Sequence, residues 1–114
     1  MNADKVKSLA RAVIETENRA IAQLLDRVDD EFVSACEAMI ACEGRVIVTG
    51  MGKSGHIGSK IAATLASTGT PAFFVHPGEA SHGDLGMITH RDVVIGISNS
   101  GETHELVTLS LIHI

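Results

Sequence analysis

The stretch VIVTGMGKSGHIGSKIA, residues 46–62, limits the possible folds more than any other part of the chain. A run of β-branched residues is followed by Gly50, Gly52 and Gly55, in the spacing G-x-G-x-x-G, and then by small residues at helical intervals. The apolar run is typical of a strand buried on both faces, and the glycines suit a turn that holds an anion at a helix start. The stretch therefore predicts a strand, a loop and a helix, which form one unit of a parallel α/β sheet.

The rest of the chain supplies further elements of the same kind. Apolar residues at helical spacing predict two helices before the first strand, and Gly44 is the expected C-terminal stop of the second. Their apolar stripes are expected to pack against a core or a second copy of the chain; in the second helix the stripe is Phe32, Val33, Cys36, Met39 and Ile40. The expected helices cover residues 4–26, 30–42 and 54–67, with another opening in 98–114, and the expected strands cover 45–49, 72–76 and 93–97.

This order of elements predicts an α/β fold, a three-layer α-β-α sandwich with a parallel sheet and the flavodoxin-like strand order 2-1-3. Three strands make an incomplete sheet, because both faces and both edges of a parallel sheet need cover, and the chain stops in the apolar run 109–114. We therefore expect a piece of a longer protein. A helical segment would cover residues 1–44, and the first part of the sheet domain would cover residues 45–114.

Composition and charge argue against several classes of protein. The 114 residues carry a net charge of -5, where a nucleic-acid-binding protein would be basic, and no apolar segment approaches the roughly 20 residues that span a bilayer. The first residues lack the apolar core of a secretion signal, which favours the cytoplasm. Cys36 and Cys42 fit reduced packing residues, and the six histidines show no metal-ligand spacing, so neither a metal nor a cofactor is expected.

Three kinds of anion could occupy the glycine loop. A Walker A loop is excluded, because its first glycine would fall at Ile47, inside the strand. A dinucleotide site stays open, although the acidic residue that would bind its ribose, Glu79, lies beyond Pro77 and Gly78. The third possibility is a phosphate monoester.

A second loop favours the phosphate monoester. The stretch GISNSGET, residues 96–103, places Ser98, Ser100 and Thr103 around a glycine after the third strand. With the strand order 2-1-3, the loops after the first and third strands face each other, so these hydroxyls and Ser54 would converge on one phosphate. Alternatively, Ser100 is an ordinary helix N-cap with Thr103 in the first turn.

The stretch GMGKSGHIGSKIAATLASTGTPAFFVHPGEASHGDLGMI and the later SNSGET resemble the sugar isomerase (SIS) domain of D-arabinose 5-phosphate isomerases. The resemblance covers nearly the whole chain and implies a five-stranded parallel sheet in a three-layer sandwich. It implies interconversion of D-ribulose 5-phosphate and D-arabinose 5-phosphate, on the way to the Kdo sugar of lipopolysaccharide or capsule. Members of the family commonly form dimers or tetramers and usually carry a pair of CBS (cystathionine-β-synthase) modules, which are absent from this chain.

The resemblance also assigns site residues. It places catalytic positions on Lys53, His82 and Glu105. Substrate contacts fall on Gly52, Ser54, Ser98, Asn99, Ser100 and Thr103. Aldose-ketose isomerisation through an enediol needs a base that moves a proton between C1 and C2, a donor for the developing oxyanion and a grip on the phosphate. Two residues have plainer interpretations, since His82 could cap its loop and Glu105 could serve the helix dipole. His56 and His76 could also line the site but are assigned no role.

Part of the active site is expected to lie outside this chain, so the chain would bind a sugar phosphate weakly and would not turn it over. Besides the dinucleotide site, two functions stay open: a non-catalytic phosphosugar sensor and an isomerase for another phosphosugar. The acidic segment 1–44 argues against the sensor, which would carry a basic DNA-binding region. The expected partners are a small sugar phosphate and further copies of the chain, with neither nucleic acid nor membrane.

Overall fold

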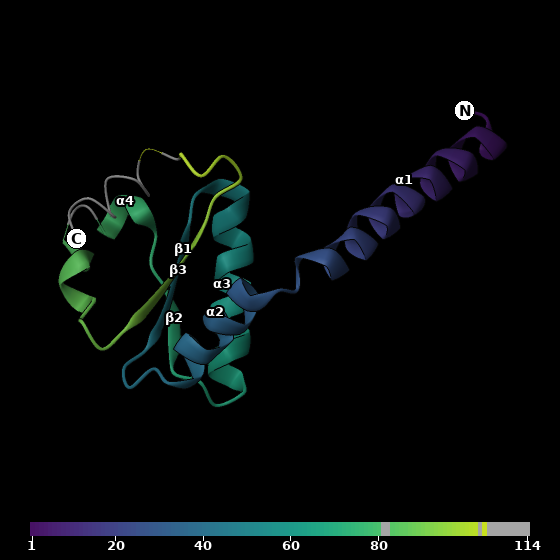
Figure 1. The fold of residues 1–114 in the computed structure, drawn as a ribbon. Coiled ribbons are helices and arrows are strands. Elements are labelled where there is room, and N and C mark those ends of the chain that lie inside the picture. The colour runs from purple at the N-terminus through teal and green to yellow at the C-terminus, as the bar shows by residue number, and fades with distance from the viewer. Residues whose placement is uncertain (81–82, 103, 105–114) are drawn as a thin grey trace. The chain divides into compact units, whose positions relative to one another are not determined.

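The computed structural model describes residues 1–80, 83–102 and 104 (Figure 1). The chain divides into two units, Met1–Glu37 and Ala38–Ile114, and the sheet belongs to the second. Among the described residues, no helix is long and apolar enough to cross a membrane.

A polar side chain caps the N-terminus of each of the first two α-helices. Asn2 caps α1, because its side-chain oxygen accepts hydrogen bonds from the backbone N–H groups of Asp4 and Lys5. Asp29 starts α2 in the same way, accepting from the N–H of Phe32. The structure ends both helices a few residues before the predicted ends. Their bounds are α1, Ala3–Gln23, followed by a 3₁₀ turn, Leu24–Arg27, and α2, Asp30–Ile40.

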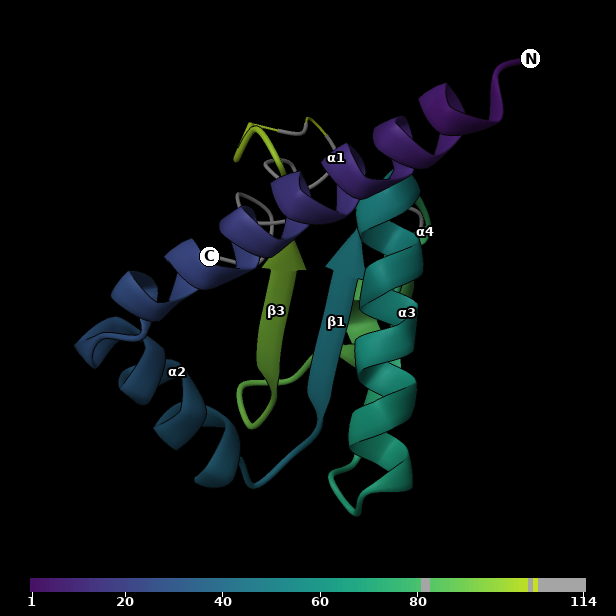
Figure 2. The ribbon, with the colours of Figure 1, turned by 90° about the vertical axis from the view of Figure 1, so that its right-hand side faces the viewer.

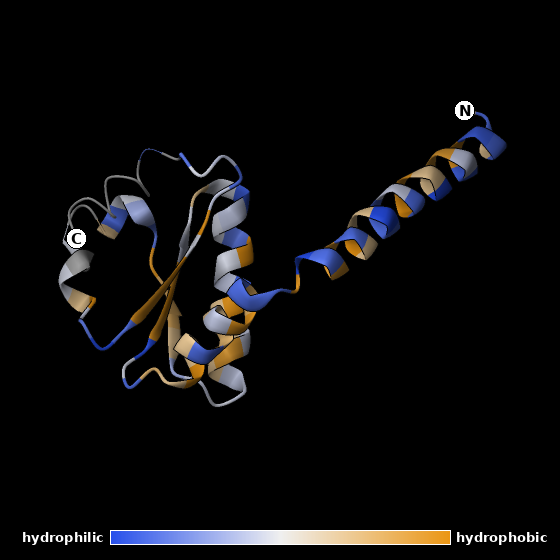
Figure 3. Ribbon diagram, viewed as in Figure 1, coloured by the Kyte–Doolittle hydropathy of each residue, from blue (hydrophilic) through white to orange (hydrophobic). Residues whose placement is uncertain are grey.

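The apolar stripe of α2 is only partly covered. Phe32, Val33 and Ile40 keep 53%, 49% and 85% of their surface exposed, whereas Cys36 and Met39 are half-buried. Within this chain the first three are therefore not buried against the core, and their packing against a second copy stays a prediction. Figure 3 shows hydrophobic and hydrophilic residues interleaved along α1, of which no residue is buried.

The sheet consists of three parallel strands in the order β2-β1-β3, which confirms the order predicted from the sequence. The central strand, β1, is buried along its whole length, as its β-branched run predicts. β2 is two residues shorter than predicted, although Val75 N–H still donates to Val48 O at 2.9 Å. The pairing stops there because Pro77 opens a short helix, α4, Pro77–Ala80. The strands are β1, Val46–Gly50, β2, Ala72–Phe74, and β3, Val93–Ile97.

Different helices cover the two faces of the sheet. α3, Gly52–Ser67, lies over one face, and α4 lies over the other with the 3₁₀ turn Asp84–Met87 (Figure 1). Neither short helical segment is predicted from the sequence. The buried residues fall into two clusters, one on each face of the sheet. Val46 and Val48 of β1 pack with Ala62 of α3, and the opposite face holds Ile47, Val75, Ala80 and Ile88. The arrangement is the predicted α/β/α sandwich.

Gly44 has a different role from the one predicted. α2 ends four residues earlier, at Ile40, and Gly44 does not adopt the left-handed conformation of a helix C-terminal glycine. Its N–H donates to Arg91 O at 2.9 Å, and an added Cβ would lie 2.6 Å from that same oxygen. A glycine is needed here because the chain entering β1 passes close to the chain entering β3.

Asp92 joins the amino ends of β1 and β3. Its Oδ1 accepts from Arg45 N–H at 2.7 Å, and its Oδ2 accepts from Thr89 N–H at 2.8 Å. These hydrogen bonds, the one from Arg45 first, hold the pKa of the Asp92 carboxyl below its ordinary value. The Arg45 guanidinium in turn lies 4.7 Å from the centre of the Phe73 ring and donates to Met87 O. These polar contacts at the amino ends of the strands therefore stabilise the fold.

Candidate functional site

The loops that follow β1 and β3 leave the same edge of the sheet side by side. Gly50 pairs with Ile97 in the register of the two strands, so both chains turn out of the sheet at the same level (Figure 2). A Cβ on Gly50 would lie 3.1 Å from Ile97 O and 3.0 Å from the backbone carbonyl carbon of Ser54. The two loops predicted to meet at the switch point of the sheet are therefore adjacent.

The N-terminus of α3 presents backbone N–H groups without a side-chain cap. Its N-cap, Met51, has an extended backbone and makes no side-chain hydrogen bond to the helix. The first N–H groups of a helix have no partner within it, and here they belong to Gly52, Lys53 and Ser54. They lie at the positive end of the helix dipole, where an anion is stabilised. Gly52 and Lys53 are exposed, and Ser54 is half-buried.

The loop after β3 is shaped by its own serines. Ser98 Oγ accepts from Gly101 N–H at 2.9 Å, and Ser100 Oγ accepts from Glu102 N–H at 3.0 Å, while Asn99 between them is exposed. The Ser100 bond has the form of an N-cap contact, as the plainer interpretation of this serine predicts. A hydroxyl that accepts one bond still has its own hydrogen to donate, so this contact is compatible with anion binding by Ser100.

The structure thus brings together six of the nine predicted site residues. They come from two loops and are Gly52, Lys53 and Ser54 after β1, and Ser98, Asn99 and Ser100 after β3. The other three, His82, Thr103 and Glu105, lie outside the residues that the structure describes. Glu79, the acidic residue of the dinucleotide interpretation, lies in α4.

His76 belongs to the same edge, although the sequence gives it no role. It follows β2, and its exposed ring accepts a hydrogen bond at Nδ1 from Gly78 N–H at 3.1 Å. Continuing the register of β1 and β2 by two residues puts His76 opposite Gly50, level with the glycine loop. Its place as the last residue of the predicted strand 72–76 is the signal that could have singled it out, because parallel strands end at one edge of their sheet.

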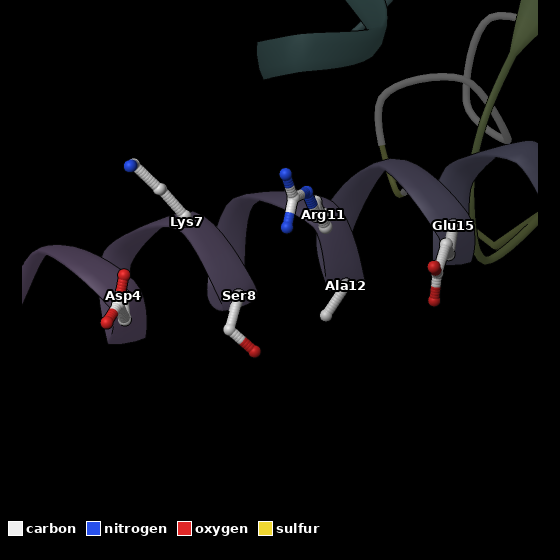
Figure 4. Close-up of a pocket in the computed structure, with 6 residues that line it drawn as sticks. All are labelled: Asp4, Lys7, Ser8, Arg11, Ala12 and Glu15. Carbon is white, nitrogen blue, oxygen red and sulfur yellow. The ribbon is translucent and has the colours of Figure 1, made fainter.

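The described residues give little support for a site elsewhere. No group of three His, Cys, Asp or Glu side chains among them is placed to hold a metal ion. Figure 4 shows a hollow along α1 that is lined by Asp4, Lys7, Ser8, Arg11, Ala12 and Glu15. These residues share one helix and carry both signs of charge, so they neither enclose a ligand nor select its charge.

Comparison with known proteins assigns this fold to a family. Residues 39–112 match the model of the SIS domain. The chain belongs to the SIS-domain family. The match confirms the resemblance drawn from the glycine loop, the HPGEASHGDLG block and the serine loop.

The SIS-domain chain is similar to arabinose 5-phosphate isomerases. KdsD of Yersinia pestis, which bears that name, is 64% identical over 99 residues, covering 87% of this chain and 30% of the relative. KdsD of Pseudomonas aeruginosa is 63% identical over 108 residues, covering 95% of this chain and 33% of the relative. Escherichia coli CFT073 c3406, solved in complex with arabinose 5-phosphate, is 46% identical with a TM-score of 0.90, covering 98% of this chain and 61% of that one. This chain spans about a third of the length of the curated relatives it matches.

Proposed function

We propose that this chain forms part of the sugar-phosphate site of an arabinose 5-phosphate isomerase, which interconverts D-ribulose 5-phosphate and D-arabinose 5-phosphate. The observation that carries the proposal is the pairing of Gly50 with Ile97, which puts the loops after β1 and β3 side by side. Identities of 64% and 63% to arabinose 5-phosphate isomerases support this choice of substrate. The arabinose 5-phosphate complex of the similar Escherichia coli structure supports it as well.

In this proposal the phosphate binds where the two loops meet. Gly52, Lys53 and Ser54 supply N–H groups, an ammonium and a hydroxyl, and residues 98–103 close on the phosphate from the other side. A lysine at a helix start opposes the helix dipole, at a cost of about 0.3–1 kcal/mol. A bound phosphate dianion would offset that cost, because it attracts the Lys53 ammonium and the helix N–H groups together.

The proposed chemistry moves a proton between C1 and C2 of the sugar through an enediol. His82 or Glu105 would remove the proton and return it to the neighbouring carbon. Stabilisation of the oxyanion that develops is the alternative role of Lys53, in place of its contact with the phosphate. Further acidic and histidine positions of the family fall outside this chain, so we expect weak binding without turnover. Residues 1–44 would then be a helical segment that precedes the domain, and residues 45–114 its first part.

The pathway, the compartment and the oligomeric state are proposed from the same similarity to arabinose 5-phosphate isomerases. The product would supply Kdo synthesis for lipopolysaccharide in the cytoplasm, and the isomerase would act as a dimer or tetramer. Exposed apolar side chains on α1 support self-association, because contiguous apolar surface is a common contact between copies. They include Leu9, Val13, Ile14 and Ile21.

Titration of the purified chain with D-arabinose 5-phosphate, D-ribulose 5-phosphate and NAD tests the proposal against the dinucleotide interpretation. We expect both pentose phosphates to bind and NAD to show no binding at the same concentrations. Tighter binding of NAD than of either pentose phosphate would contradict the proposal. The same samples are assayed for isomerisation, and turnover that disappears in Lys53→Ala would overturn the expectation of an incomplete site.

Lys53→Ala tests the phosphate contact itself. We expect the affinity for both pentose phosphates to fall about 10- to 100-fold, because a hydrogen bond to a charged group contributes roughly 1.5–3 kcal/mol. Lys60→Ala is the matched control, since Lys60 is also an exposed lysine of α3, two turns farther along the helix. Equal effects of the two substitutions would mean that Lys53 acts only through general charge.

A further inference from the structure

His76 lies where β2 leaves the sheet, at the edge that carries the glycine and serine loops. Its backbone O accepts from Ala80 N–H at 3.0 Å, and its Nδ1 accepts from Gly78 N–H at 3.1 Å. The imidazole therefore caps α4 with an acceptor on the ring, in the way that an asparagine or serine caps other helices. An added Cβ on Gly78 would lie 3.1 Å from the same Nδ1, which shows how closely the ring lies against this turn.

This hydrogen bond fixes which ring nitrogen of His76 carries the proton. An imidazole nitrogen that accepts a bond has no hydrogen, so the neutral ring must carry its hydrogen on Nε2. The side chain is exposed, and Nε2 has no hydrogen-bonding partner among the residues that the structure describes. His76 thus carries an exposed N–H donor on a residue at the carboxyl edge of the sheet.

The order of the strands indicates what this donor would meet. β1 separates β2 from β3, so the ends of β2 and β3 lie about 10 Å apart, at two strand spacings. The proposed phosphate lies between the ends of β1 and β3. A ligand that extends from this phosphate along the edge, over the end of β1, brings its other groups toward His76. A neutral N–H donor suits the uncharged hydroxyl or carbonyl oxygens of a sugar.

We propose that His76 positions the sugar of the bound phosphosugar, by donating a hydrogen bond from Nε2 to a hydroxyl or carbonyl oxygen. This inference rests on the sugar-phosphate site proposed above and adds a third strand end to it. The phosphate binds at the ends of β1 and β3, and the sugar lies across to the end of β2. His76 is then a substrate-positioning residue that acts on the sugar and leaves the phosphate contacts unchanged.

Two substitutions separate this role from the capping role of the ring. His76→Asn keeps an acceptor at the position of Nδ1 and removes the donor at Nε2, and asparagine is a favourable N-cap. His76→Gln places an amide N–H near the position of Nε2. The matched control is His90→Asn, because His90 is an exposed histidine in the turn before β3, at the amino end of the sheet.

The experiment titrates each variant of the full 114-residue chain with D-arabinose 5-phosphate and with inorganic phosphate. We expect His76→Asn to bind the sugar phosphate roughly 3- to 10-fold more weakly, as the loss of one neutral hydrogen bond predicts, with unchanged phosphate affinity and melting temperature. His76→Gln should recover part of the lost affinity, and His90→Asn should match the original chain.

Three other outcomes of the titration would each contradict either the role of His76 or the proposed function. If the original chain binds D-arabinose 5-phosphate and His76→Asn binds it equally well, the positioning role is wrong and the proposed function stands. If His76→Asn loses affinity for inorganic phosphate to the same degree, the ring acts on the loop rather than on the sugar. If the original chain binds inorganic phosphate but not the sugar phosphate, the proposed function fails, and this inference fails with it.

Discussion

Replacing Thr49 by valine should stabilise the protein, which is the reverse of the usual effect of a substitution in a central strand. Thr49 is 1% exposed in the middle strand of the sheet, and its Oγ1 has no hydrogen-bond partner within the described part of the chain. Mutational data put the cost of a buried hydroxyl without a partner at roughly 1–3 kcal/mol. Valine has nearly the same shape, is also β-branched, and leaves no polar atom without a bond. We therefore expect the free energy of unfolding to rise by about 1–2 kcal/mol.

Urea unfolding followed by circular dichroism measures this change. At roughly 4–8 °C per kcal/mol for a domain of this size, Thr49→Val should also raise the melting temperature by about 4–16 °C. Thr68→Val is the control, because the exposed Thr68 hydroxyl donates to Thr64 O at 2.8 Å, so its loss should destabilise slightly or have no effect. A Thr49→Val protein less stable than the original would refute the reasoning, since it would mean that Oγ1 has a bonding partner in solution.

Two further predictions concern the packing and the charge of the sheet. Gly55→Ala should destabilise the protein by about 1–3 kcal/mol in urea, because the new Cβ would lie 2.7 Å from Gly50 O, whereas Gly86→Ala, with open space around it, should change little. The pKa of Asp92 is lowered by its bond from Arg45 N–H, so the stability that this carboxylate contributes is fully present above its ordinary value of 3.8 and is lost as the pH falls through the lower folded value. Asp92→Asn should therefore reduce the free energy of unfolding at pH 6 more than at pH 2.5, and an equal reduction at both would contradict the assignment.

Local patterns in the sequence predict the central part of the fold well. The run Val46–Thr49 identifies the central strand, because β-branched residues buried on both faces leave a continuous apolar signature. The serine loop after β3 identifies the second half of the candidate site, and the strand order then places it beside Lys53. The central strand and the strand order are confirmed because each depends on a few consecutive residues and on a general rule of parallel sheets, whereas the ligand contacts of the serine loop stay a prediction.

Two features are missed, one because it depends on a distant residue and one because its helix is short. Gly44 is interpreted as a helix stop, yet its constraint comes from Arg91 O, 47 residues away in the sequence. The capping bond from Gly78 N–H to His76 Nδ1 follows from the turn of α4, a helix too short to leave a periodic pattern. Sequence therefore locates the loops of the candidate site, while the hydrogen bond of a single ring at the same edge requires coordinates.

The three glycines of the loop show why the motif alone does not choose a ligand. Gly50 is confined between the backbones of Ser54 and Ile97, and Gly55 lies against Gly50 O, so both are required by the packing of α3 on β1 and of β1 on β3. Only Gly52, with a φ of 57° and open space around it, faces outward. Because Gly50 and Gly55 are required by packing, the spacing G-x-G-x-x-G does not select a ligand and suits any anion that fits a helix start. In the function proposed above, the selection between a dinucleotide and a sugar phosphate would then come from the other strand ends, through the serines after β3 and His76 after β2.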